Sequence, residues 1–369
     1  MKYYIIAGEA SGDLHGSNLM KALLKEDDKA NIRFWGGDLM QAVGGELVMH
    51  YKERQFMGFA EVIMNLRKIS GHIKFCKKDI AQFQPDVIIF IDNSGFNLRI
   101  VKKLRALCDV PIVYYISPQL WAWKEKRIKV FQKYVDQSLS IFPFEQSWFE
   151  SRGVPTNYVG HPFSENIGPT LTKKEFYLKH NIKTEKRIIT LLPGSRQQEV
   201  DLLWPVFYES AMKIKEKEDV EIVVGKYSGV KLPDQKNIII EKDDVYAAMS
   251  YAQAAITASG TAALECAVMD TPEVVCYKLS FVSAFIAKRL NKAPFISMVN
   301  LIVNRKVVTE FLQNEVRVDN IVEAVIPLLS HTNERKNMLL SFDEMRRSLG
   351  LPGVYKRAAE SIMKKVSFG

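Results

Sequence analysis

Asp92 stands at the end of an apolar run, residues 86–91, that has the composition of a buried parallel strand. Ligands of open parallel sheets bind outside the carboxyl ends of the strands. A carboxylate in that place, partly shielded from water in a cleft, can take the proton from an attacking hydroxyl group. The alternative is that Asp92 caps the helix that follows, and the residues by themselves leave both interpretations open.

Arg196 closes a segment of the same kind in the second half of the chain. A predicted strand, residues 187–192, leads through Pro193, Gly194 and Ser195 to Arg196 and then into a predicted helix. A guanidinium at a helix start donates charge-assisted hydrogen bonds to phosphate oxygens, each contributing about 1.5–3 kcal/mol. The partial positive charge of the helix terminus adds to this attraction. The segment is therefore a candidate phosphate site, with an ordinary surface arginine as the alternative.

A second candidate phosphate site follows the predicted strand at residues 254–257. Ser259, Gly260 and Thr261 are small residues at a helix start, where backbone N–H groups can approach an anion closely. Glu265 lies one turn further on, where its carboxylate could bind ribose hydroxyls, although a plain helix cap would look similar. Two anion-binding turns in one half of the chain favour a nucleoside diphosphate as the ligand.

The first turn of the chain, residues 8–16, is rich in glycine, but its spacing differs from the GxGxxG fingerprint of dinucleotide-binding proteins. Glu9 and Asp13 would repel a pyrophosphate, yet they could accept hydrogen bonds from sugar hydroxyls, and Ser11 and Gly12 lie between them. The alternative is a tight strand-to-helix turn in which Ser11 or Asp13 caps the helix.

These segments need a scaffold of alternating strands and helices. Short β-branched runs, each followed by a helical stretch, predict βαβ units and parallel sheets. The predicted strands are residues 2–7, 86–91, 111–116, 137–142 and 156–160, and then 187–192, 220–225, 237–241, 254–257 and 273–277. A polar stretch at residues 164–186 separates two Rossmann-like halves. We expect an α/β protein with domains at residues 1–165 and 166–340 and a helical tail at residues 341–369.

The composition is that of a globular protein. Among 369 residues, 47% are apolar and 25% are charged, which excludes a disordered or fibrous chain. The four cysteines show no CxxC spacing and are too few for a disulfide framework, so we expect reduced thiols in the cytoplasm. The N-terminal residues lack the features of a signal peptide, and no apolar run reaches the roughly 18 residues that a spanning helix needs.

The net charge of +9 favours anionic partners such as phosphorylated substrates or acidic lipid surfaces. Nucleic acid is the least favoured anion, because the sequence has no zinc-finger spacing, no RNP-like motif and no long basic tail.

Several of these segments, taken in order, resemble the motifs of lipid-A-disaccharide synthases over nearly the whole chain. The matching segments are GEASGD (residues 8–13), MGFAEV (57–62), SPQLWAW (117–123), PFE (143–145), VGH (159–161), LPGSR (192–196) and ASGTAALE (258–265). A series of motifs at family-like spacing is far more specific than any one of them.

The resemblance implies a GT-B fold, with two Rossmann-like domains facing across a cleft and C-terminal helices that cross back to the N-terminal domain. It implies a hexosyltransferase of lipid A and lipopolysaccharide biosynthesis. The donor would be UDP-2,3-diacylglucosamine and the acceptor 2,3-diacylglucosamine 1-phosphate (lipid X). The products would be the β-1,6-linked disaccharide 1-phosphate and UDP, formed with inversion and with neither a metal nor another cofactor.

The resemblance also assigns residues. Asp92 matches the family's candidate base, and Arg196 its UDP-binding arginine. The remaining matches are Gly194, Ser195, Ser259, Gly260, Thr261, Glu265, Asn300 and Glu310 around the donor, and Glu9, Ser11, Gly12 and Asp13 in the N-terminal turn on the acceptor side. The sequence departs from the family pattern at Gly95, where a second acid is common.

Acylated substrates imply peripheral contact with the cytosolic leaflet of the inner membrane. An apolar stripe at helical spacing is flanked by lysines and arginines and consists of Val62, Leu66, Ile69, Ile73, Cys76 and Ile80. The alternative is that a helix buries this stripe against its own sheet. The predicted lipid contacts are Met57, Phe59, Met64, Arg67 and Lys68.

Two other classes of function share some of these features. Another GT-B enzyme, such as a UDP-sugar epimerase or a peptidoglycan glycosyltransferase, would have the diphosphate site but not the full motif series. A noncatalytic nucleotide- or lipid-binding regulator would keep Arg196 but would need no base. The sequence does not distinguish a monomer from a homodimer.

Overall fold

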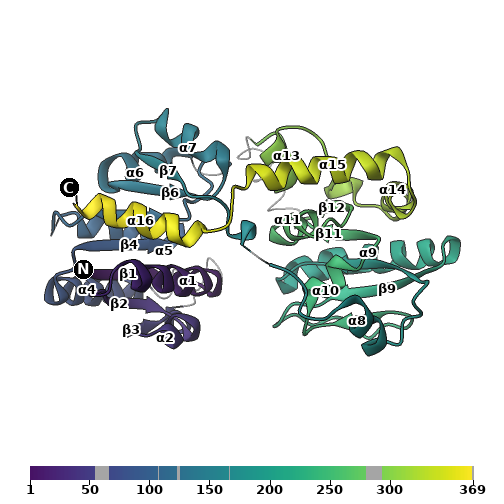
Figure 1. Ribbon diagram of the computed structural model, residues 1–369, viewed down its shortest axis with the longest axis horizontal. Coiled ribbons are helices and arrows are strands. Elements are labelled where there is room, and N and C mark those ends of the chain that lie inside the picture. Colours follow the sequence, from purple (N-terminus) through teal and green to yellow (C-terminus); the bar gives the residue numbers. More distant parts are fainter. Residues whose placement is uncertain (55–65, 107, 123–124, 166, 280–292, 368–369) are drawn as a thin grey trace. The chain divides into compact units, whose positions relative to one another are not determined.

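The structure is a computed structural model that describes residues 1–54, 66–106, 108–122, 125–165, 167–279 and 293–367. It divides into two compact units. The first unit comprises Met1–Glu165 and Gly350–Gly369, and the second comprises Asn166–Leu349. The chain therefore leaves the first unit and later returns to it (Figure 1).

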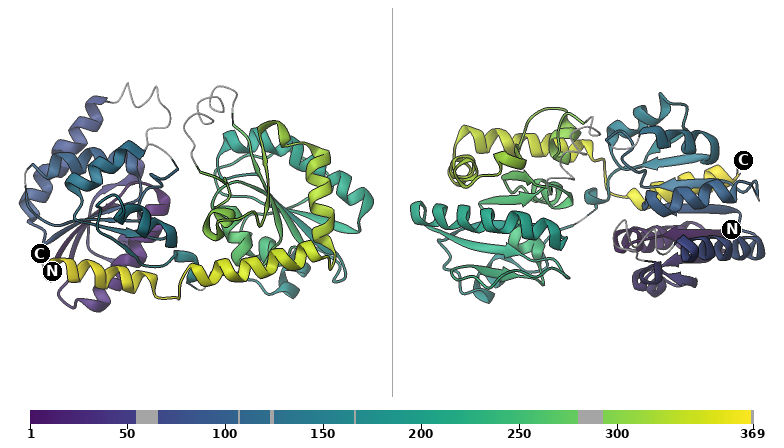
Figure 2. Two further views of the ribbon diagram at one scale, coloured as in Figure 1. Left: turned by 90° about the horizontal axis from the view of Figure 1, so that it is seen from above. Right: turned by 180° about the vertical axis from the view of Figure 1, so that it is seen from behind.

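The first unit is built on a sheet of seven parallel strands in the order β3-β2-β1-β4-β5-β6-β7. The strands are β1 (Lys2–Ala7), β2 (Asn31–Gly36), β3 (Glu46–His50), β4 (Val87–Ile91), β5 (Ile112–Tyr115), β6 (Gln137–Ser140) and β7 (Thr156–Tyr158). Helices cover both faces of the sheet (Figure 2), so its central strands are buried on both sides and read as continuous apolar runs.

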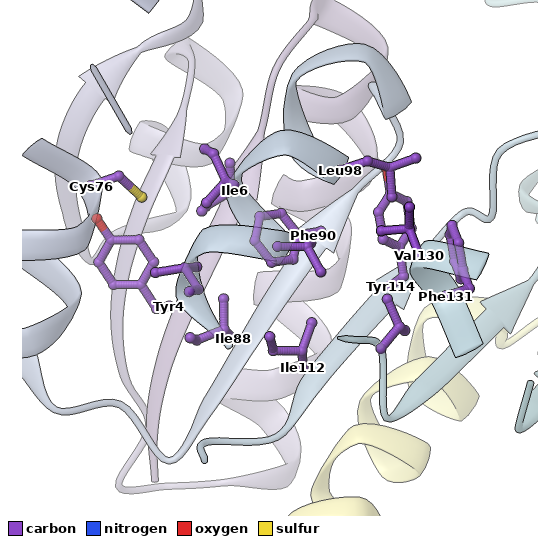
Figure 3. Close-up of a cluster of buried hydrophobic side chains, with 14 of the residues drawn as sticks. Tyr4, Ile6, Cys76, Ile88, Phe90, Leu98, Ile112, Tyr114, Val130 and Phe131 are labelled. Atoms are coloured by element: carbon purple, nitrogen blue, oxygen red, sulfur yellow. The ribbon is translucent and has the colours of Figure 1, made fainter. Parts of the chain in front are cut away.

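Among its described residues, the first unit has the helices α1 (Ala10–Glu26), α2 (Asp38–Val43), α4 (Leu66–Phe83), α5 (Ser94–Leu104), α6 (Ile128–Tyr134), α7 (Pro143–Glu150) and α16 (Val354–Ser367). In the cluster of Figure 3, Phe90 of the sheet lies with Cys76 of α4 and Phe131 of α6. Ile73, Cys76 and Ile80 of α4 are all buried in this cluster. This part of the apolar stripe therefore packs against the protein's own sheet, as the alternative interpretation had it, and is not available to lipid.

The second unit has six parallel strands in the order β10-β9-β8-β11-β12-β13. The strands are β8 (Arg187–Leu192), β9 (Val220–Gly225), β10 (Ile239–Glu241), β11 (Ala254–Ala258), β12 (Glu273–Tyr277) and β13 (Thr309–Leu312). The helices in the described ranges of this unit are α8 (Lys173–Lys179), α9 (Gln197–Lys217), α10 (Val245–Ser250), α11 (Thr261–Val268), α13 (Met298–Val303), α14 (Val318–Val325) and α15 (Asn333–Ser348). Every strand predicted from the sequence is present, and β2, β3 and β13 are additional.

The C-terminal helix α16 returns to the first unit, as predicted, and packs against α1 (Figure 1). Its N-terminal N–H groups, those of Gly353 and Val354, donate to the Glu165 carboxylate at 3.0 and 2.8 Å. The return begins later than residue 341, because α15 runs without a break to Ser348 and stays in the second unit. The glycine turn from Gly350, with φ +87°, to Gly353, with φ +96°, makes the separation instead.

Candidate active site

In each sheet, the predicted site segments lie where the strand order reverses. In the first unit the chain runs from β1 outward to β2 and β3, and then restarts at β4 on the other side of β1. In the second unit it runs from β8 to β9 and β10 and restarts at β11. Such reversals open a crevice at the carboxyl ends of the two central strands. Asp92 and the turn after β1 lie at the first reversal, and the segments after β8 and β11 lie at the second.

The backbone of Asp92 is held rigidly at the end of β4. Its N–H donates to the Tyr115 carbonyl at 3.1 Å. Its carbonyl accepts from Tyr114 Oη at 2.5 Å and from Nδ2 of the buried Asn97 at 2.9 Å. Asp92 and Asn93 both have left-handed backbones, with φ of 46° and 38°, and Asn93 caps α5 by accepting from the Phe96 N–H. Since Asn93 provides this cap, the carboxylate of Asp92 is not needed for it.

The pKa of the Asp92 carboxyl is raised to about 6. Burial is the main cause, the negative charge of Glu9 adds to it, and a hydrogen bond from the Asn93 backbone opposes it. The group is therefore mostly ionised at pH 7 and is more basic than an ordinary aspartate. Such a carboxylate is suited to proton abstraction near neutral pH.

The turn after β1 lies against the turn after β4. A Cβ at Gly8 would come within 2.2 Å of Asn93 Nδ2, so a larger residue would displace the side chain that caps α5. Glu9 is the N-cap residue of α1 but makes no side-chain cap hydrogen bond. Glu9 and Ser11 are exposed, whereas Gly12 is buried where a Cβ would lie 3.3 Å from that of Ala7. The structure thus brings Glu9 close to Asp92 and leaves both Glu9 and Ser11 accessible.

Asp13 has a structural role in the first unit. Its buried carboxylate accepts from three backbone N–H groups at the start of α2, those of Gly37 at 2.8 Å, Leu39 at 3.0 Å and Met40 at 3.0 Å. Asp13 therefore caps α2. Contrary to the alternative interpretation, the side chains of Asp13 and Ser11 do not cap α1. A sugar hydroxyl would have to compete with these three hydrogen bonds.

Arg196 lies at the start of α9 with 81% of its side chain exposed. Its guanidinium is 3.4 Å from Glu199 Oε1, and an exposed pair of this kind contributes only about 0–1 kcal/mol. A phosphate can therefore replace Glu199 as the partner of Arg196 at little cost in free energy. Gly194 has φ +123°, and a Cβ there would lie 2.7 Å from Glu199 Oε2, so glycine lets the Ser195–Arg196 turn close over Glu199.

Ser259, Gly260 and Thr261 form the turn from β11 into α11. Gly260 has φ +153°, and among the described residues no atom lies within 4 Å of a Cβ built there, so its backbone conformation is what favours glycine. The Ser259 hydroxyl donates to the Ile296 carbonyl at 3.4 Å, which links this turn to the segment before α13. Gly260 and Thr261 are exposed at the helix start. Their accessibility is consistent with an anion-binding turn.

Glu265, one turn into α11, is held by two tyrosines that the sequence reasoning missed. Its oxygens accept from Tyr227 Oη and Tyr246 Oη, each at 3.1 Å. Burial raises the pKa of Glu265, and the two tyrosine hydrogen bonds oppose that shift. Tyr227 follows the carboxyl end of β9, and Tyr246 lies in the first turn of α10. Their positions after strand ends of a parallel sheet could have identified both tyrosines as site residues.

Asn300 and Glu310 shape the segment beside Ser259. Asn300 is fully buried; its amide donates to the Val308 carbonyl and to Glu310 Oε1, and its oxygen accepts from the N–H groups of Val307 and Val308. These four hydrogen bonds use the whole capacity of an Asn side chain, so it has none left for a ligand. Glu310 also accepts from the backbone N–H groups of Ile296 at 3.0 Å and Ser297 at 2.9 Å.

The predicted membrane contacts are not described by the structure. Met57, Phe59 and Met64 lie outside the described residues, and for Arg67 and Lys68 the description covers only the backbone of α4. Within the described ranges, no helix has both the length and the apolar character needed to cross a bilayer. In those same ranges, no three His, Cys, Asp or Glu side chains are grouped as a metal site would require.

Comparison with known proteins points to one family. A family model described as "Lipid-A-disaccharide synthetase" matches residues 3–366. The lipid-A-disaccharide synthase of Acidobacterium capsulatum is 35% identical over 369 residues, covering 95% of this chain and 92% of that protein. The corresponding protein of Myxococcus xanthus is 34% identical over 372 residues, covering 98% of this chain and 96% of that protein.

Solved structures with low sequence identity share the fold. The structure of S. aureus MnaA with UDP has a TM-score of 0.68 at 12% identity, covering 100% of this chain and 97% of that one. The glycosyltransferase of kitacinnamycin has a TM-score of 0.65 at 14% identity, covering 99% and 98%. Together with the two parallel sheets, these likenesses confirm the α/β, GT-B fold that the sequence predicts.

Proposed function

Because the chain belongs to the lipid-A-disaccharide synthetase family, and is thus a glycosyltransferase, we propose that it condenses UDP-2,3-diacylglucosamine with 2,3-diacylglucosamine 1-phosphate. The products are UDP and a β-1,6-linked disaccharide 1-phosphate with inverted configuration at the anomeric carbon. The observation that carries the proposed chemistry is the carboxyl group of Asp92. It follows the end of β4, where the strand order reverses, and its pKa is about 6, while Asn93 caps the helix that follows.

In the proposed reaction, Asp92 takes the proton of the acceptor's 6-hydroxyl as the oxygen attacks the anomeric carbon of the donor. The bond from that carbon to the UDP oxygen breaks, and its electron pair leaves with the diphosphate. Arg196 and the N–H groups at the start of α11 stabilise the growing charge on the diphosphate. Glu265, fixed by Tyr227 and Tyr246, is oriented to accept from the ribose hydroxyls. The first unit thus serves the acceptor and the second the donor.

Gly95 does not disable this mechanism. The family's second acid is missing at this residue, yet within the described part of the chain a Cβ built there would have one neighbour within 4 Å, Asn93 Oδ1 at 3.9 Å. The fold therefore leaves room for a side chain at residue 95 and does not require glycine there for steric reasons. In this chain the carboxylate that acts electrostatically on Asp92 is Glu9, so the base of the proposed reaction is Asp92 with Glu9 as its neighbour.

The proposal includes peripheral binding to the cytosolic leaflet of the inner membrane. Both substrates carry acyl chains, and the chain has a net charge of +9. On α4, Lys74 and Lys78 are exposed next to Phe75, which is 44% exposed. Lysines beside an exposed ring suit an anionic lipid surface. Co-sedimentation with vesicles that contain anionic lipid, compared with neutral vesicles, tests this part of the proposal.

A purified-protein assay tests the reaction itself. We expect UDP release from UDP-2,3-diacylglucosamine only when lipid X is also present, together with formation of the disaccharide. An epimerase would change the UDP-sugar without the acceptor, and a noncatalytic regulator would release no UDP.

The variant Asp92→Ala should abolish turnover and leave UDP binding nearly intact. Asp28→Ala is the matched control, because it removes an exposed carboxylate from the same unit away from the crevice. Full turnover by Asp92→Ala would refute the assignment of the base.

A further inference from the structure

The loop after β5 is held in a strained conformation. Ile116, a β-branched residue, has a left-handed backbone with φ 61°, which is rare for such side chains. Its N–H donates to the Leu139 carbonyl at 3.0 Å, and the buried Ser117 hydroxyl shares a hydrogen bond with Ser138 Oγ at 2.6 Å. Strained residues of this kind persist where the surroundings fix them, and they gather at functional sites.

This loop presents Trp121 in a fixed orientation. Its neighbours Leu120 and Ala122 are buried, whereas Trp121 is half-buried. The indole N–H donates to Glu145 Oε1 at 3.1 Å. The ring also packs edge-on against Phe144, with centroids 5.0 Å apart and an angle of 83° between the ring planes. One hydrogen bond and one ring contact therefore fix the plane of the indole.

Glu145 is an unusual anchor, because its side chain is fully buried. It lies in the first turn of α7, where it also accepts from the Phe142 N–H at 3.4 Å. Burial raises the pKa of this carboxyl to about 8, while the hydrogen bonds from Trp121 and from the backbone oppose that shift. Burying a carboxyl costs free energy that an apolar residue would not cost. Besides accepting a backbone N–H at the start of α7, this carboxyl fixes the orientation of the Trp121 indole.

The Trp121 loop leaves the same edge of the sheet as Asp92. Strands β4, β5 and β6 are adjacent and parallel, with Ile91 opposite Tyr115 and Tyr115 opposite Leu139. Neighbouring strands lie about 4.8 Å apart, so the segments that follow them start side by side. The Asp92 N–H also bonds the carbonyl of Tyr115, the residue before the strained Ile116. The indole is thus built into the edge that carries the proposed base.

We propose that Trp121 is the platform on which the glucosamine ring of the acceptor packs, and that Glu145 is the positioning residue that holds the indole in place. This inference rests on the proposed function. A glucosamine ring has an apolar face of C–H groups that packs on the face of an aromatic ring, as aromatic side chains of ligand sites commonly allow. The acceptor is the sugar concerned, because Asp92 at the same edge takes the proton from the acceptor's hydroxyl.

The test compares four variants in the two-substrate assay. Trp121→Ala should raise the KM for lipid X roughly tenfold or more, with little change in the KM for the UDP-sugar, because a lost stacking contact acts on acceptor binding. Trp121→Phe keeps a ring but loses the N–H, so its KM for lipid X should lie between those of Trp121→Ala and the wild type. Glu145→Gln keeps an oxygen that accepts the indole N–H and should behave like the wild type, whereas Glu145→Met should resemble Trp121→Phe.

A second readout does not depend on turnover. Lipid X should quench the tryptophan fluorescence of the wild type, and Trp121→Phe should lose most of that quenching although four tryptophans remain. UDP binding, measured for every variant, reports that the second unit is intact, and circular dichroism reports that the secondary structure of the whole chain is retained.

An unchanged KM for lipid X in a folded Trp121→Ala variant would overturn the proposed platform. A Glu145→Gln variant as impaired as Glu145→Met would overturn the positioning role of Glu145. If the wild type itself shows no turnover that depends on lipid X, the proposed function fails, and the quenching experiment still decides whether Trp121 contacts the sugar.

Discussion

Replacement of Asp92 by Asn should abolish catalysis and at the same time stabilise the first unit. The pKa of Asp92 is about 6 in the folded protein, compared with an ordinary value of 3.8. A group with a raised carboxyl pKa binds its proton more tightly in the folded state than in the unfolded state. Ionisation of Asp92 therefore lowers the free energy of unfolding, and a neutral amide in its place avoids that loss.

The magnitude follows from the two pKa values. A change of one pH unit in a pKa corresponds to about 1.4 kcal/mol, so ionised Asp92 costs the folded state about 3 kcal/mol. Well below pH 3.8 both states are protonated and the cost is absent. It grows as the pH rises from 3.8 to about 6 and is constant above that. Asparagine also tolerates the left-handed backbone at this residue, where φ is 46°.

Urea unfolding of the wild type and Asp92→Asn at several values between pH 4 and 8 measures this effect. Tryptophan fluorescence is a suitable signal, because four of the five tryptophans belong to the first unit. We expect the stability advantage of Asp92→Asn to increase from near zero at pH 4 to about 3 kcal/mol at pH 7.

Asp13→Asn is the matched control in the same unit. It should be destabilised over the whole pH range, because the Asp13 carboxylate accepts three backbone N–H groups. An Asp92→Asn variant that is no more stable than the wild type at pH 7, or whose advantage does not shrink on acidification, would refute the view that Asp92 is an ionised, desolvated base.

Three further expectations concern the other site residues. In the wild type, kcat/KM should fall about tenfold per pH unit below pH 6 as Asp92 becomes protonated. In Glu9→Gln this decrease of kcat/KM should begin at a lower pH, because the charge of Glu9 raises the pKa of Asp92. Arg196→Ala should lower kcat/KM about 10- to 150-fold without changing the urea midpoint, and Arg196→Lys should restore only part of the loss, because a lysine cannot bind a diphosphate in a bidentate manner. Asn300→Ala should destabilise the second unit by at least about 2 kcal/mol, as followed by circular dichroism, because it breaks four buried hydrogen bonds. If the pH dependence of kcat/KM is the same in Glu9→Gln as in the wild type, the charge of Glu9 does not raise the pKa of Asp92. A lower urea midpoint for Arg196→Ala would contradict its role in binding the diphosphate, and an unchanged stability of Asn300→Ala would contradict the structural role of Asn300.

The central strands were predictable because burial on both faces requires an unbroken apolar sequence, as in β1 and β4. The edge strands β3 and β13 were missed because their residues are largely half-exposed and lack such a run. Strand β2 was missed too; its buried residues are interrupted by Arg33, which pairs with Asp79 of α4.

The candidate site was predictable to the extent that it depends on strand ends. Asp92 and Ser259 follow such ends directly, and Arg196 lies four residues beyond the end of β8. The roles of Asp13 and Asn300 were not predictable, because they depend on long-range or fully internal pairing. Asp13 bonds backbone groups 24 to 27 residues away in sequence, and Asn300 is saturated by a segment that folds back on it.

The return of α16 also has a consequence for the order in which the protein can fold during synthesis. The second unit is a continuous segment and can complete its contacts once residue 349 has emerged from the ribosome. The first unit must wait, because the helix that packs against α1 consists of residues 354–367. The first unit is therefore completed after the second, and its surface beneath α16 stays uncovered until residues 354–367 have been synthesised.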